Sequence, residues 1–165
     1  MSILVEELKK LASMTTGKQH DCMVEMLGDA RDVVVCSIHD VFTDDEIRKI
    51  KRRVKPKAKE CYKNAFLLTE LFPDKVQYVE GKFTCMKFVS LEHAWNKVGD
   101  KYVDITMEMA LKKNPKDEEY MSLGCYSYGD IVDVVLRNGY YGEIYYEKKI
   151  KTKFIKLGSR KPRSL

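Results

Sequence analysis

The 165-residue chain has no apolar run long enough to cross a membrane, no CxxC cysteine pair and no glycine-rich phosphate-binding motif. The first absence argues against a membrane partner, because a spanning helix needs about 20 consecutive apolar residues. The second argues against a structural zinc site, so we expect no metal and no other cofactor. The third argues against nucleotide binding through a P-loop or a dinucleotide-binding fold.

Cysteine is present, but in an odd number and without metal-ligand spacing. The five residues are Cys22, Cys36, Cys61, Cys85 and Cys125. The N-terminal sequence MSILVEELKKLAS predicts an amphipathic helix rather than a signal peptide, because charges interrupt its apolar residues. These features predict a cytoplasmic protein whose thiols are free, one of which could be reactive.

Positive charge is concentrated in one stretch of the chain. The net charge is only +5, but the segment from Arg48 to Lys59 contains eight basic residues and no acidic one. One interpretation is a solvated helix face. The other is a surface that binds nucleic acid or another acidic partner. A second basic segment forms the C-terminal tail, about residues 148–165.

The periodicity of apolar residues changes along the chain from a helical to a strand pattern. Helices are predicted over residues 2–12, 44–53, 60–72 and 130–137. Strands are predicted over residues 33–38, 76–89, 92–98, 101–107 and 140–150, and residues 124–126 as a turn-like stretch. Thr43 and Glu46 form a capping-box pattern before the second helix. The order predicts one α+β domain, residues 1–165, with N-terminal helices packed on an antiparallel sheet.

Three residues have local settings that suit thiol chemistry. Cys61 lies near the start of a predicted helix, where unpaired amides favour the thiolate form. His93 and Asp104 lie on consecutive predicted strands, and paired strands can hold two side chains against each other. A carboxylate in that position orients the imidazole, whose other nitrogen can face a thiol.

Each of these residues has a structural alternative when it is taken alone. A cysteine on a helix is usually a small buried side chain. A histidine on a strand is usually structural, and an aspartate there is usually a turn or edge residue. The combination of Cys61, His93 and Asp104 is what favours a nucleophile, a base and an orienting group.

Four segments resemble the transglutaminase-like superfamily, in the order that this family has them. They are Cys61-Tyr62-Lys63-Asn64-Ala65, the strand Val76 to Gly81, His93-Ala94-Trp95, and Val103-Asp104-Ile105-Thr106. The resemblance covers residues 56–107. The His-Ala-Trp segment followed by Asp-x-Thr is its most specific part. It implies a papain-like, transglutaminase-core fold and acyl transfer through a cysteine thiol.

Carried over to this chain, the resemblance makes Cys61 the nucleophile, His93 the general base and acid, and Asp104 the orienting carboxylate. Lys59 departs from the pattern, because the family often has glycine two residues before the cysteine. The reaction stays open between a peptidase, an amidase and a transfer to an amine, and the superfamily includes members without activity. The candidate substrate-binding residues are Asn64, Tyr78 and Trp95, with core packing as the alternative for each.

Overall fold

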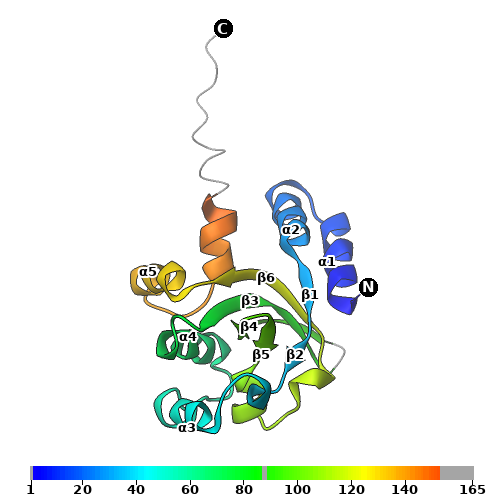
Figure 1. The fold of residues 1–165 in the computed structure, drawn as a ribbon. Helices are drawn as coiled ribbons and strands as arrows, with labels where there is room; N and C mark the ends of the chain where they lie inside the picture. Colours follow the sequence, from blue (N-terminus) through cyan, green and yellow to red (C-terminus); the bar gives the residue numbers. More distant parts are fainter. Residues whose placement is uncertain (1, 87–88, 153–165) are drawn as a thin grey trace.

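The computed structural model describes residues 2–86 and 89–152, which form helices around one curled β-sheet (Figure 1). The helices are α1 (Ile3–Met14), α2 (Gly17–Asp29), α3 (Asp44–Arg53), α4 (Cys61–Leu71) and α5 (Tyr128–Asn138). The strands are β1 (Arg31–Val33), β2 (Val35–Cys36), β3 (Val76–Cys85), β4 (Val89–Val98), β5 (Lys101–Val103) and β6 (Tyr120–Tyr126). Short helical segments are η1 (Ile38–Asp40), η2 (Thr106–Ala110), η3 (Pro115–Asp117) and η4 (Tyr146–Lys151). The fold is therefore in the predicted α+β class.

The sheet has the strand order β1-β6-β3-β4-β5-β2. Its pairs are antiparallel except that β2 runs parallel to β5. The sheet is thus mixed, and the prediction of a purely antiparallel sheet is corrected in this respect. The central hairpin of β3 and β4 is paired along ten residues of each strand, and His93 lies directly opposite Gly81.

Two strong local signals fix the helices that precede this hairpin. The capping box predicted at α3 is present, because the Thr43 side chain accepts from the Glu46 amide and the Glu46 side chain accepts from the Thr43 amide. Helix α4 packs Ala65 and Phe66 against Tyr78 and Ala94 of the hairpin. Figure 1 shows α3 and α4 on one side of the sheet and α1 and α2 beside β1 and β6. No helix in the described ranges is long and apolar enough to cross a membrane.

Gly81 allows β6 to approach the central hairpin closely. A Cβ atom at this position would lie 2.0 Å from the Met121 carbonyl oxygen and 2.8 Å from the Trp95 ring. The pairing of β3 with β6 also shifts register between Glu80 and Gly81, because Leu123 is an extra residue that forms a bulge in β6 at this point. The glycine of the predicted Val-x-Gly segment is therefore required by packing.

Residues 140–150 were predicted as an aromatic strand, and this prediction is wrong, because the chain from Ile144 onward is helical. The Glu80 carboxylate accepts hydrogen bonds from the amides of Ile144 and Tyr145, at 3.1 and 2.8 Å. First amides of a helix need such acceptors, so a residue on a distant strand supplies the cap. This tertiary contact overrides the strand preference of the tyrosines.

The other differences from the predicted elements involve short strands. The predicted strand 33–38 is split into β1 and β2 at Val34, whose side chain is 83% exposed. The predicted strand 101–107 ends at Val103, and Asp104 instead precedes η2. Residues 124–126 are not a turn but part of β6, which the sequence analysis did not predict. The basic tail from residue 153 onward lies outside the described residues.

Candidate active site

Cys61 is the first residue of α4 and is partly exposed. The residue before it, Glu60, places no side-chain cap on the helix. The first backbone amides of α4 therefore have no intrahelical partner and carry the positive end of the helix dipole. This position favours a negatively charged thiolate sulfur and leaves the Cys61 amide available as a donor.

The loop before Cys61 is held by the helix that follows it. Asn64 accepts a hydrogen bond from the Lys57 amide at 3.1 Å and donates one to the Lys57 carbonyl at 2.7 Å. It also donates to the Thr106 hydroxyl at 3.0 Å, two residues after Asp104. Asn64 thus ties the approach to Cys61 to the segment that carries the candidate carboxylate.

Lys59 has a φ of 65°, in the left-handed region that favours glycine. This is the position at which the resembling family often has glycine. We therefore expect Lys59→Gly to raise the free energy of unfolding by up to about 1 kcal/mol, because relief of left-handed strain exceeds the added chain entropy. Thermal melts check this, with Lys57→Gly as the control at a residue without positive φ. A Lys59→Gly variant less stable than the wild type would contradict the expectation.

The His93 ring and the Asp104 carboxylate form a short buried hydrogen bond. Nε2 of His93 lies 2.6 Å from Oδ2 of Asp104, and both side chains are almost fully buried. The turn between β4 and β5 brings the two residues together, because Asn96 of β4 pairs with Val103 of β5. Asp104 follows that pair immediately, so it lies at the end of β5 rather than within a strand.

Asp104 has three further hydrogen-bond donors. Its Oδ1 accepts from the amides of Thr106 and Met107, at 2.9 and 3.1 Å. Its Oδ2 accepts from the Tyr120 hydroxyl at 3.0 Å. These hydrogen bonds fix the orientation of the Asp104 carboxyl group against the imidazole.

The Cys61 thiol lies close enough to the His93 ring to help raise its pKa. Since Nε2 faces Asp104, Nδ1 is the nitrogen left for the thiol. Burial alone would lower the pKa of His93, but the charge and hydrogen bond of Asp104, together with Cys61, raise it to about 10. The raised pKa favours the imidazolium form of the ring at neutral pH.

Aromatic side chains surround the imidazole. The Phe83 ring lies 4.3 Å from the His93 ring, centroid to centroid, and the Trp95 and Tyr120 rings lie at 6.1 and 6.3 Å. Aromatic faces attract cations and exclude water. The packing therefore keeps the ring in one orientation, with Nε2 toward Asp104.

The three candidate substrate-binding residues are all buried, each with about 1% of its surface exposed: Asn64, Tyr78 and Trp95. Asn64 holds the loop described above. Tyr78 donates its hydroxyl hydrogen to Glu80 at 2.6 Å. Trp95 packs edge-on against Tyr120 at 5.2 Å. In this structure their contacts are with the protein interior.

Tyr120 is not among the predicted site residues, because no strand is predicted for the residues that form β6. The alternation of Tyr120, Ser122 and Tyr126 with Met121 and Leu123 is a strand pattern that could have indicated it. The side chains of Tyr120 and Met121 are both buried, as expected for a strand covered on both faces.

Tyr120 is a positioning residue in this arrangement, because it acts through Asp104. We expect Tyr120→Phe to lower kcat/KM about tenfold through loss of one hydrogen bond to a charged group, with a small change in melting temperature. Tyr126→Phe is the matched control, since the buried Tyr126 hydroxyl has no hydrogen-bond partner among the described residues. Equal activity of the two variants would contradict this role for Tyr120.

Other features of the described residues complete the site. No group of three or more histidine, cysteine, aspartate or glutamate side chains there is arranged to hold a metal ion. The eight basic side chains of the Arg48–Lys59 stretch are exposed, and Arg48 pairs with Asp45.

Comparison with known proteins finds no matching family model, no matching curated protein and no matching solved structure.

Proposed function

We propose that the chain is a cysteine-dependent acyl-transfer enzyme with a transglutaminase-like, papain-like fold. The observation that supports this is the 2.6 Å hydrogen bond of His93 with Asp104, together with the nearby Cys61 thiol at the start of α4. The nucleophile, the base and the orienting group come from three separate elements and meet at one helix end. Such an arrangement is a general signature of nucleophilic catalysis.

In the first step, the Cys61 thiolate attacks a substrate carbonyl carbon. A C–S bond forms, and the carbonyl π electrons move to the oxygen. The free backbone amide of Cys61 is one donor for that oxyanion. Collapse of the intermediate breaks the bond to the leaving amine or alcohol, which takes its proton from Nδ1 of His93. The product is a thioester on Cys61.

In the second step, water or an amine attacks the thioester carbonyl. His93 removes the proton of the attacking group, the C–S bond breaks, and the Cys61 thiolate is restored. Asp104 remains ionised and stabilises the imidazolium. A peptidase or amidase uses water, and a transferase uses an amine, with the same residues.

The experiment that tests this function is capture of the acyl-enzyme. The full chain is mixed with a panel of activated acyl donors, such as peptide and simple acyl esters, and quenched in acid. Intact-protein mass spectrometry should then detect a single acyl adduct, and peptide mapping should assign it to Cys61. Acyl adducts distributed among all five cysteines, with no preference for Cys61, would argue against the proposal.

The alternative is a non-catalytic module of the same fold that binds an anionic partner. The observation that favours it is the exposure of all eight basic side chains from Arg48 to Lys59, which gives the second half of α3 and the following loop a strongly positive face. Nucleic acid or an acidic protein surface would suit this face. The two proposals differ in whether Cys61 has unusual thiol reactivity.

A further inference from the structure

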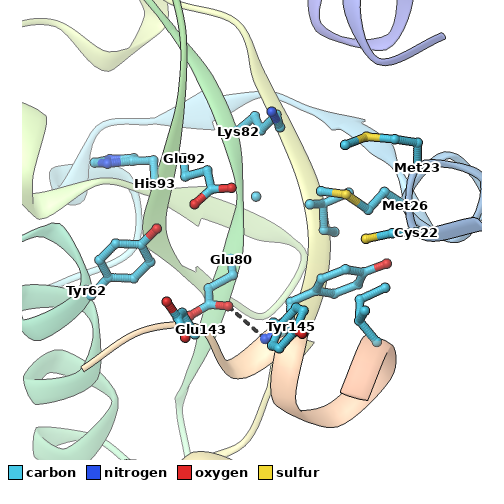
Figure 2. A pocket seen from close by; sticks show the side chains of 14 residues that line it. Cys22, Met23, Met26, Tyr62, Glu80, Lys82, Glu92, His93, Glu143 and Tyr145 are labelled. Atoms are coloured by element: carbon cyan, nitrogen blue, oxygen red, sulfur yellow. Dashed lines mark hydrogen bonds between the residues drawn. The ribbon is translucent and has the colours of Figure 1, made fainter. Parts of the chain in front are cut away.

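A pocket of about 230 Å³ lies against His93, between the central hairpin, α2 and the segment that leads into η4 (Figure 2). Pockets for whole small molecules are usually larger, about 300–1,000 Å³. This volume therefore suits a single side chain of a larger substrate. The lining residues used below are Cys22, Met23, Met26, Glu80, Glu92 and Glu143.

One wall of the pocket is apolar and rich in sulfur. Cys22, Met23 and Met26 come from α2, and Figure 2 shows their side chains grouped on one side of the pocket. Leu123 and Ile150 extend the same apolar surface. Unbranched thioether side chains adapt to the shape of a neighbouring aliphatic chain, so this wall suits a methylene stem.

The opposite side of the pocket is acidic. It contributes three carboxyl groups, and Lys82 is the one basic side chain besides His93 among the described residues that line the pocket. The Glu80 carboxyl group is engaged by the Tyr78 hydroxyl and the amides of Ile144 and Tyr145, so its role is to hold the wall together. Glu92 has no hydrogen-bond or ion-pair partner among residues 2–86 and 89–152, and its side chain is exposed.

The acidic side of the pocket lies next to the start of α4, which carries Cys61. The pKa of Tyr62 is raised, first by burial and then by the negative charges of Glu80, Glu92, Cys61 and Glu143. Tyr62, the residue after Cys61 on α4, lines the pocket together with these three carboxyl groups. Glu143 also adopts a φ of 57°, a strained conformation for a residue other than glycine, which is common where side-chain direction matters.

We infer that this pocket binds an alkylammonium group, with its aliphatic stem along the α2 wall and its cationic head at Glu92 and Glu143. A lysine side chain and a free diamine share this chemistry. The group is recognised rather than consumed, and it positions the substrate beside Cys61. The inference uses the proposed function only for that last point, because the binding itself requires no reaction.

The test is equilibrium binding to the full chain carrying Cys61→Ala, so that no turnover interferes. The probes are Nα-acetyl-lysine N-methylamide, its neutral norleucine counterpart and 1,5-diaminopentane, measured by titration calorimetry at low salt. We expect the lysine derivative to bind about tenfold more tightly than the norleucine derivative. Tighter binding of the lysine derivative than of the diamine supports a peptide-borne group, and the reverse supports a free amine.

Two variants locate the binding. Glu92→Gln, and more strongly the double variant with Glu143→Gln, should weaken binding of the lysine derivative about three- to tenfold. Asp74→Asn removes the same charge at an exposed site outside the pocket and should leave the affinity unchanged. Equal affinity for the lysine and norleucine derivatives, unchanged affinity in the double variant, or no binding up to about 10 mM would overturn the inference. Absence of an acyl-enzyme in the wild type would instead overturn the proposed function and leave this inference standing.

Discussion

Replacing Cys61 with alanine is expected to abolish acyl transfer, with a loss of about 10⁴-fold or more in kcat/KM. The thiolate is the atom that forms the covalent intermediate, and the other groups of the site cannot replace it. Cys61→Ser should be nearly as inactive, because a hydroxyl group is far less acidic than a thiol and His93 would have to remove its proton completely.

The fold should survive the Cys61→Ala change. Cys61 is partly exposed at a helix start, so its removal leaves no buried cavity, and the free energy of unfolding should change by less than about 1 kcal/mol. Thermal melts check this, and turnover is measured on the donors that form the acyl-enzyme. Cys125→Ala is the matched control, since Cys125 is an exposed thiol on β6. Wild-type turnover in Cys61→Ala would end the thiol-enzyme proposal.

Asp104→Asn is expected to lower kcat/KM by about 10²–10⁴-fold. The amide can present a donor to Nε2 of His93, which changes the tautomer of the ring, and it cannot stabilise the imidazolium. Without the carboxylate, burial becomes the dominant influence and the pKa of His93 should fall. The alkaline limb of the pH–rate profile and the histidine NMR titration should report this fall.

The matched control for Asp104→Asn is Asp117→Asn, which makes the same chemical change at an exposed site in η3. The two amides of Thr106 and Met107 can still donate to an asparagine oxygen, so the turn after β5 should persist. A variant with activity within about threefold of the wild type would show that Asp104 does not orient the base.

Local signals in the sequence were sufficient to predict the helix that carries Cys61 and the strand that carries His93. The Thr43 capping box and the apolar spacing of residues 60–72 specify two helices without help from the rest of the chain. The hairpin of β3 and β4 is long and strongly patterned. The placement of His93 and Asp104 side by side then follows from the short turn between β4 and β5.

The parts that could not be predicted depend on contacts between distant segments. The helix after Ile144 is capped by Glu80, a residue 64 positions earlier, and no local pattern encodes that bond. The Tyr120 hydrogen bond to Asp104 requires β6 to lie beside β3, on the far side of the hairpin from β5. The pocket next to His93 is formed by six separate segments, so its acidic character is a property of the fold.

Lys59 has a left-handed backbone conformation at the position where the resembling superfamily often has glycine. The absence of glycine at this position is visible in the sequence, but its effect on stability depends on the backbone conformation of Lys59. With a φ of 65°, Lys59 occupies the conformation that glycine would adopt more easily. The departure therefore changes stability locally and preserves the course of the chain into Cys61.

The rate of Cys61 alkylation as a function of pH tests the thiolate–imidazolium pair most directly. The wild-type chain is treated with limiting iodoacetamide between about pH 5 and pH 9, and each cysteine is quantified by peptide mass spectrometry. Because the pKa of His93 is about 10, the imidazolium persists across this range. Cys61, which lies next to this imidazolium, should therefore react fastest of the five thiols.

The other thiols supply the internal comparison. Burial raises the pKa of Cys22 and Cys36 above its ordinary value, so their alkylation should be slow. The predicted result is a fast reaction at Cys61 beside slow reactions at these two thiols. A Cys61 rate no higher than the rates of Cys22 and Cys36 would contradict the pair and favour the non-catalytic binding module.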